Sequence, residues 1–210
     1  MGPESPRTTV RLDSTDSTSA LARRRIAAGD LSGHGAVFVA ATQTNGVGRL
    51  GRAWASPRGG LWCTLAQPID PAAVEGLGLR VGEAMCAAIQ TALVRAGSAA
   101  RVVMKQPNDA LIEGRKVAGV LTEILAPTRP ERPVSGTKWA LVGVGINANF
   151  AYSDLPEPLR ATATTLRDCL RIERIQRDID LEALLADLTE RLTAAITAPA
   201  NPAGSSPARR

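Results

Sequence analysis

Aromatic residues and histidine are scarce in this chain. Of its 210 residues, 3% are aromatic and one, His34, is a histidine. Because 44% of the residues are hydrophobic, the sequence predicts a core built from Val, Leu, Ile and Ala. A single histidine excludes most His-based metal sites and catalytic triads. We therefore expect no metal centre made by the protein alone.

Cysteine is also rare and has no regular spacing. The three cysteines are Cys63, Cys86 and Cys169. Their odd number argues against a disulfide framework, and their spacing matches no metal or redox motif. The sequence predicts three buried or idle thiols in a reducing cytoplasm.

Long apolar runs are missing as well. No run of about 18 apolar residues occurs, and the first ten residues, MGPESPRTTV, lack an apolar segment. These features predict neither a membrane span nor a signal peptide. The net charge of +5 permits nucleic-acid binding, but the arginines are scattered, and Arg23–Arg25 fall in an expected helix as a solvated face. We therefore expect no nucleic-acid and no membrane partner, and a cytoplasmic protein.

Hydrophobic periodicity predicts an α+β domain. Helices are expected at 19–28, 74–96 and 181–196, and strands at 8–13, 36–41, 61–67, 101–105, 110–112, 116–124 and 139–146. The strands do not alternate strictly with helices, so we expect a mixed sheet and not a doubly wound one. We also expect a flexible N-terminus at 1–7, a single catalytic domain at 8–197, a proline-rich loop at 127–136 and a disordered tail at 198–210.

A glycine- and arginine-rich loop, TNGVGRLGRAW at 44–54, fits the dinucleotide-binding pattern G-x-G-x-x-G. That pattern requires a helix to begin within the loop. The following residues, AWASPRGG, contain Pro57 and two glycines, which exclude such a helix. No Gly-Lys-Ser/Thr follows either, so the loop is not a Walker motif. Glycine amides with Arg49, Arg52 and Arg58 suit a loop that closes over anionic groups. A solvated surface loop is the alternative.

Three further segments carry polar residues beside apolar strands. They are KQPND at 105–109, KVAGVL at 116–121 and GVGIN at 143–147. Two of the chain's three lysines, Lys105 and Lys116, fall here. Glycines inside a strand often mark the close approach of a ligand or of another backbone. Taken singly, these features are also explained by turns, strand ends and sheet packing.

Four segments together resemble the catalytic domain of biotin–protein ligases, which share a fold with lipoate ligases. DSTS at 16–19 is similar to the family's DSTN, and QTNGVGRLGRAW at 43–54 is similar to Q-x-x-G-R-G-R-x-G-R-x-W. KQPND with KVAGVL is similar to K-W-P-N-D…K-x-A-G-I-L, and GVGIN to G-x-G-I-N. The resemblance covers roughly residues 8 to 195. It implies a mixed sheet packed with helices, of the class II aminoacyl-tRNA-synthetase-like type.

The resemblance also implies an activity with ATP, Mg²⁺ and biotin. Biotinyl-5′-AMP would form first, and the biotinyl group would pass to a lysine of a carboxylase acceptor domain. Lys116 and Arg49 would be catalytic. The remaining implied assignments are biotin contacts from Ser17, Thr18, Ser19, Gln43, Gly46, Val47, Gly48, Arg49, Lys116 and Gly119, and nucleotide contacts from Arg49, Arg52, Trp54, Lys105, Asn108, Asp109 and Asn147. Mg²⁺ would arrive with ATP, and the protein would be a monomer or a homodimer.

The chain departs from the family pattern at three positions. Ser19 replaces Asn, Val47 replaces an Arg on the biotin side, and Gln106 replaces Trp. We also expect neither an N-terminal DNA-binding domain nor a complete SH3-like C-terminal domain. Two other functions are left open by these features: an acyl ligase for lipoate or octanoate, and a binding-only paralogue without transfer. Singly, Ser17 and Thr18 are also explained as helix caps, and Trp54 as a core residue.

Overall fold

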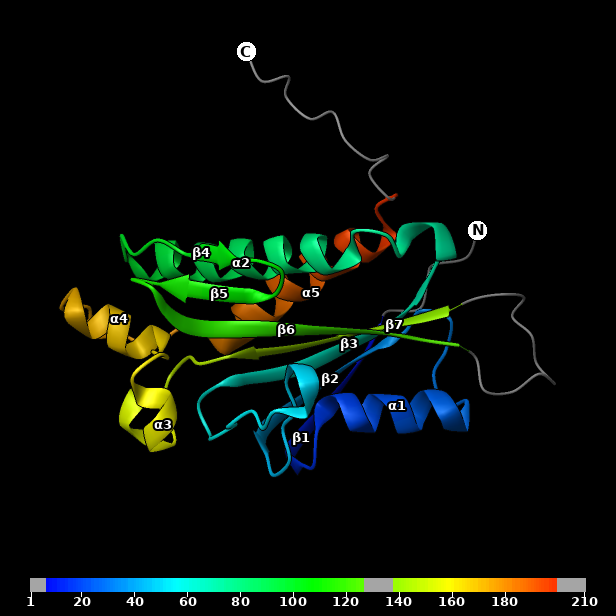
Figure 1. Cartoon of the computed structure of the whole chain (residues 1–210), viewed down its shortest axis with the longest axis horizontal. Helices are drawn as coiled ribbons and strands as arrows, with labels where there is room; N and C mark the ends of the chain where they lie inside the picture. Colours follow the sequence, from blue (N-terminus) through cyan, green and yellow to red (C-terminus); the bar gives the residue numbers. More distant parts are fainter. Residues whose placement is uncertain (1–6, 127–137, 200–210) are drawn as a thin grey trace, which may run out of the picture.

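A seven-stranded sheet organises the computed structural model, which describes residues 7–126 and 138–199 (Figure 1). Its strand order is β1-β2-β3-β7-β6-β5-β4. The β1–β2 pair is parallel and the other neighbouring pairs are antiparallel. The expectations for the proline-rich loop and for most of both termini fall outside the described residues.

The mixed sheet confirms the predicted α+β class. The strands are β1 (Thr8–Thr15), β2 (Ala36–Gln43), β3 (Leu61–Ile69), β4 (Val103–Lys105), β5 (Asp109–Ile112), β6 (Arg115–Leu125) and β7 (Lys138–Ile146). The central strands β3 and β7 are the most deeply buried. Their successive side chains point to opposite faces of the sheet. Each face therefore has its own helical cover.

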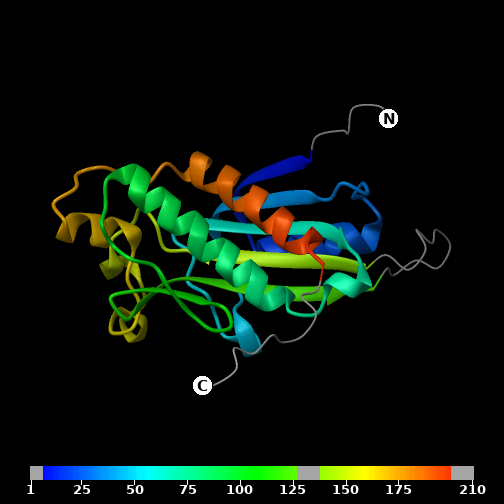
Figure 2. The same ribbon diagram turned by 90° about the horizontal axis from the view of Figure 1, so that it is seen from above.

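One face is covered by two long helices that lie side by side across it, α2 (Leu77–Ala96) and α5 (Leu181–Thr197) (Figure 2). Their buried residues join the largest core cluster, together with Val37 and Leu65 of the sheet. By length and composition alone, α2 would also pass as a membrane-spanning helix. Its apolar stripe is buried against α5 and the sheet, so we interpret it as a core helix.

The opposite face carries α1 (Thr18–Ala28) at one end (Figure 1). Ser17 is its N-cap and accepts a hydrogen bond from the Ala20 amide, and Gly29 ends it with a left-handed φ of 75°. Phe38 and Leu141 lie buried beneath this helix. The basic residues of α1 are exposed and form ion pairs, as expected for a solvated face.

A smaller third cluster lies on this same side, beyond the N-terminus of α1. Trp62 is fully buried there against Phe150, Leu155 and Ala163. The segment after β7 contributes two short helices that the sequence did not predict, α3 (Glu157–Arg160) and α4 (Leu166–Ile172). Three 3-10 turns complete the elements: η1 (Arg49–Gly51), η2 (Pro71–Ala73) and η3 (Tyr152–Asp154).

Five element boundaries differ from expectation by two or more residues. The strands expected to end at residues 13 and 41 continue to Thr15 and Gln43. The helix expected from residue 74 begins at Leu77, because Gly76 adopts a left-handed φ of 69° and separates it from η2. The strand expected to end at 67 continues through Pro68 to Ile69. The strand expected from residue 101 begins only at Val103.

Candidate active site

A cavity of about 290 Å³ lies on the sheet face beside the N-terminus of α1. All four sequence segments that were singled out contribute to its lining. Of the predicted site residues, those in the lining are Ser17, Thr18, Ser19, Gln43, Val47, Gly48, Arg49, Arg52, Trp54, Asn108, Asp109, Lys116, Gly119 and Asn147. Segments up to 130 residues apart in the chain therefore meet at one place, as the combined pattern predicted.

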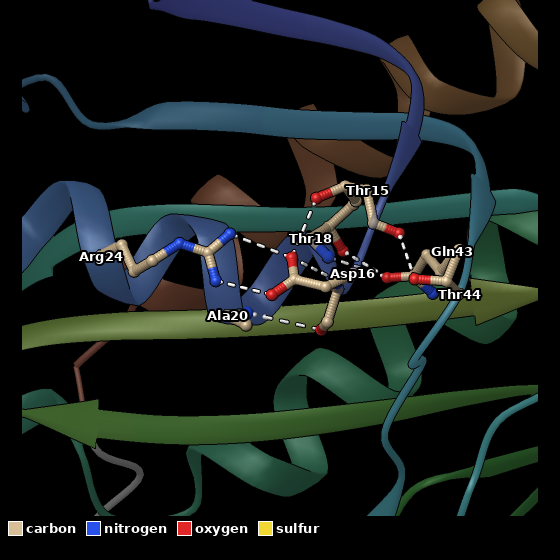
Figure 3. Close-up of polar contacts among 8 residues, drawn as sticks. Thr15, Asp16, Thr18, Ala20, Arg24, Gln43 and Thr44 are labelled. Carbon is tan, nitrogen blue, oxygen red and sulfur yellow. Dashed lines mark hydrogen bonds and ion pairs between the residues drawn. The ribbon is translucent and has the colours of Figure 1, made fainter.

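The turn between β1 and α1, which Figure 3 shows, contributes Ser17 and Thr18 to the cavity lining. The Thr18 amide and hydroxyl both lie within hydrogen-bonding distance of Gln43 Oε1, at 2.8 and 3.2 Å. Gln43 Nε2 donates to Ser56 Oγ at 2.8 Å. Ser17 caps α1 and also lines the cavity, so helix capping does not remove it from the cavity wall.

Asp16 fixes this turn from outside. Its carboxylate accepts two hydrogen bonds from the Arg24 guanidinium, at 2.6 and 2.9 Å, and one from the Ser17 amide at 2.8 Å (Figure 3). The bidentate Arg24 contact, and secondarily the Ser17 amide, hold the pKa of the Asp16 carboxyl well below its usual range.

This lowered pKa predicts a small, pH-dependent contribution to stability. The group favours folding while it is ionised, so its contribution is present at pH 7 and declines as the pH falls below about 4, the usual Asp pKa. Both side chains are about half exposed, so Asp16→Asn is expected to cost less than about 1 kcal/mol at pH 7. Thermal unfolding of both proteins across pH 7 to 3 tests this, and a difference that does not shrink with acid would contradict it.

The glycine- and arginine-rich loop folds as a narrow hairpin that forms part of the cavity lining. The Trp54 amide donates to the Gly46 carbonyl at 2.8 Å, and the Gly48 amide donates to the Arg52 carbonyl at 2.7 Å. At the tip, Arg49 Nη1 donates to Asn108 Oδ1 at 2.9 Å and so connects the loop to the β4–β5 turn. The chain then returns to the sheet as β3, which runs antiparallel to β2. The loop contains only the 3-10 turn η1 and no α-helix begins in it, so it lacks the helix that the Rossmann interpretation requires, as predicted.

Lys116 lies at the centre of the cavity wall. Its ammonium Nζ is 2.7 Å from Asp109 Oδ1 and 4.9 Å from the centroid of the Trp54 ring. Its backbone is bound to the segment after α3, because its amide donates to the Thr162 carbonyl and its carbonyl accepts from the Thr164 amide. The side chain is 30% exposed, so a cation stands fixed at the wall yet accessible from the cavity.

Three glycines in the cavity lining leave space for the side chains of Trp54 and Ser19. A Cβ at Gly145 would lie 2.6 Å from the Trp54 indole nitrogen, and one at Gly143 would lie 2.6 Å from Ser19 Oγ. At Gly119 a Cβ would be 3.2 Å from the Trp54 ring. Any larger residue would displace these side chains. The Trp54 indole N–H is buried and has no hydrogen-bond partner among the described residues.

Two predicted site residues lie outside the cavity lining. Lys105 is exposed at the end of β4, opposite Asp109 in the sheet. Gly46 is buried behind the loop, where a Cβ would lie 2.5 Å from the Trp54 carbonyl oxygen. We therefore assign Gly46 a structural role in closing the loop hairpin.

The sequence did not predict one wall of the cavity. Leu155, Leu159, Thr162 and Ala163, from the segment around α3, line it together with Gly143 and Gly145 of β7. The two glycines had been noted in the sequence, whereas the α3 segment carries no motif or periodicity that could have identified it.

The charged side chains of the lining favour an anionic ligand. Among the described residues, the lining contains three basic side chains, Arg49, Arg52 and Lys116, and a single carboxylate, that of Asp109. Cys63 also borders the cavity, but burial raises the pKa of its thiol to about 12, so it is not a thiolate nucleophile at neutral pH. In the described part of the chain, no three His, Cys, Asp or Glu side chains gather to hold a metal ion. The site can position and neutralise anions.

The sequence of the chain is similar to that of known protein ligases. The profile of the biotin/lipoate A/B protein ligase family matches residues 12–136. Curated relatives include a biotin–[acetyl-CoA-carboxylase] ligase of Mycobacterium tuberculosis, 31% identical over 85% of this chain and 61% of the relative. A ligase of the same description from Paracoccus denitrificans is 39% identical over 65% of this chain and 52% of its own length. A bifunctional ligase/repressor of Bacillus spizizenii is 35% identical over 63% of this chain.

Solved structures of biotin protein ligases have a similar fold. The biotin protein ligase of Aquifex aeolicus in complex with biotin and ATP superposes with a TM-score of 0.65, at 28% identity, over 91% of this chain and 71% of that one. The biotin protein ligase of Leishmania major in complex with biotinyl-5-AMP gives a TM-score of 0.69 at 26% identity, over 90% of this chain and 74% of that one. The chain spans 38% of the length of the Bacillus relative.

Proposed function

This chain belongs to the biotin/lipoate A/B protein ligase family, and we propose that it activates biotin with ATP and transfers it to a lysine of a carboxylase acceptor domain. The observation that carries the proposal is the cavity itself. It combines a polar end at Ser17–Ser19 and Gln43 with cationic groups at Lys116 and Arg49. Biotin has a polar ring at one end and a carboxylate at the other, so the cavity offers complementary chemistry at both ends.

In the first step, a carboxylate oxygen of biotin attacks the α-phosphorus of ATP. The bond from the α-phosphorus to the bridging oxygen breaks, and pyrophosphate leaves. Two anions must approach each other, so the main task of the protein is to hold them in line and neutralise their charge. We propose that the Lys116 ammonium exchanges its contact with Asp109 and bridges the carboxylate and the α-phosphate. No protein nucleophile is required.

Mg²⁺ fits the oxygen donors beside Lys116. Asp109 and Asn108 supply a carboxylate and an amide oxygen at the β4–β5 turn, and Mg²⁺ is usually bound by one or two carboxylates together with substrate phosphates. When bound, the ion would neutralise phosphate charge. The chain's own part is to release Asp109 from Lys116 and Asn108 from Arg49, so that each cation turns to the substrates.

In the second step, the amine of an acceptor lysine attacks the acyl carbon of biotinyl-5′-AMP. An amide bond forms, the acyl–phosphate bond breaks, and AMP leaves with the proton lost to solvent. The carboxylase acceptor is suggested by the names of the Mycobacterium and Paracoccus relatives. We further propose that a single domain at 8–197 carries both steps, with the nucleotide held by Arg49, Arg52 and Trp54.

Arg49→Ala is expected to weaken ATP use more than biotin use. The side chain lies at the loop tip and bonds only to Asn108 Oδ1 among the described groups, so it is free to turn to phosphate. Loss of one charge-assisted hydrogen bond should raise the KM for ATP by about 10- to 100-fold. Steady-state pyrophosphate release measures this, and Arg95→Ala on the exposed side of α2 is the matched control. An unchanged KM for ATP would remove Arg49 from the nucleotide site.

The alternative substrate is lipoate or octanoate, motivated by Val47. This apolar side chain lines the cavity and is 45% exposed. The polar end of the cavity supports biotin instead, because a purely aliphatic acid would leave its hydrogen-bonding groups unpaired. Isothermal titration with biotin, lipoate and octanoate, each with and without ATP, tests the choice and also identifies a binding-only protein.

A further inference from the structure

A buried threonine on β3 connects two hydroxyl groups that line the cavity. Thr64 is fully buried, and its Oγ1 lies 2.9 Å from Thr18 Oγ1 and 2.9 Å from Ser19 Oγ. Its neighbour across the sheet is Gly143, where a Cβ would lie 2.6 Å from Ser19 Oγ. The glycine leaves the space through which Ser19 reaches Thr64. Neither the motifs nor the cavity lining includes Thr64.

The direction of each hydrogen bond follows from one fixed donor. The Thr18 amide can only donate, so the group that it meets at 2.8 Å is the oxygen of the Gln43 amide. The Thr18 hydroxyl, 3.2 Å from the same oxygen, then donates to it. Because a hydroxyl has a single proton, the contact between Thr18 and Thr64 requires Thr64 as donor. Thr64 in turn accepts from Ser19.

We infer that Thr64 is a positioning residue that turns the hydroxyl protons of Thr18 and Ser19 into the protein. One lone pair of Thr18 Oγ1 accepts from Thr64, and the remaining lone pairs of both oxygens are left for the cavity, so its polar end accepts hydrogen bonds. This deepens the proposed function, on which it rests. The acid that fits carries N–H donors at the end away from its carboxylate, as a cyclic urea does. An acid with an apolar tail leaves these acceptors unpaired.

Thr64→Val tests this inference because it removes the hydroxyl while keeping the shape. Isothermal titration is expected to give a biotin affinity weaker by about tenfold or more, with the ATP affinity unchanged in the same preparation. Thr64→Ser keeps the hydroxyl and is expected to restore biotin binding. In pyrophosphate release, the loss should lie in the KM for biotin and not in kcat, and discrimination between biotin and octanoate should fall.

The outcomes separate the inference from the proposed function. If folded Thr64→Val binds biotin within about twofold of wild type, or if biotin and ATP affinity fall together, the positioning role is wrong. If the wild-type protein itself does not bind biotin, the proposed function fails instead. Should Thr64→Val not fold, Ser19→Ala breaks the same series of hydrogen bonds from its partly exposed end and must weaken biotin binding selectively.

Discussion

Lys116→Ala is expected to lower the rate of biotin-dependent pyrophosphate release by about 10²–10³. The ammonium of Lys116 lies in the cavity wall beside Asp109 and the Trp54 ring, and the Lys116 backbone is hydrogen-bonded to Thr162 and Thr164. In the proposed mechanism the ammonium would meet the carboxylate and the α-phosphate, where negative charge builds up between them. Alanine removes this charge and leaves the fold intact, because the side chain is 30% exposed.

The matched control is Lys138→Ala, at the exposed start of β7. Lys116 lines the cavity and Lys138 does not. Both variants remove one positive charge, so the comparison separates the position of the lysine from the change in net charge. The effect at Lys116 should be mainly on kcat, since the interaction strengthens in the transition state. A rise in KM alone, with kcat preserved, would make Lys116 a binding residue and not a catalytic one.

Trp62→Ala is expected to lower the free energy of unfolding by about 3–5 kcal/mol. Trp62 is fully buried, its ring centroid lies 6.1 Å from that of Phe150, and its indole N–H donates to the Pro57 carbonyl at 2.9 Å. It also underlies Leu155 and Ala163, which line the cavity. Loss of the ring leaves a large void and an unpaired carbonyl.

Chemical denaturation measures this change, with Trp139→Ala as the control. Trp139 is only partly buried, at the edge of the cluster beneath α1, so its loss should cost clearly less. Equal costs for the two tryptophans would show that the Trp62 cluster is not a main support of the fold.

Much of the site could be predicted because its chemistry lies in short segments at strand ends. The absence of a helix at 53–60 argued correctly against a dinucleotide loop, and the strands predicted at 110–112 and 116–124 are the β5–β6 hairpin. That hairpin places Asp109 opposite Gly119, and so brings the KQPND and KVAGVL segments together.

The remaining parts depend on tertiary contacts that leave no pattern in the sequence. Helix α3 has four residues and α4 seven, which is too short for a helical period to be recognised. The cavity wall at Leu155 and Leu159 was therefore missed. Lys105 was assigned to the nucleotide from its motif, but strand geometry leaves it exposed outside the cavity.

The connection of Thr64 to Ser19 depends on the packing of α1 over β3 and β7, which the spacing of residues within one strand does not reveal. The exposed Leu50 at the loop tip likewise adopts a left-handed φ of 58°, and no local residue pattern indicated it.

The most direct test of the account is exchange of labelled pyrophosphate into ATP by the wild-type protein with Mg²⁺, in the presence of biotin, lipoate or octanoate. Exchange that requires biotin, and that is lost in Lys116→Ala but not in Lys138→Ala, is the predicted result. Exchange supported by lipoate or octanoate but not by biotin, or no exchange with any of the three acids, would contradict it.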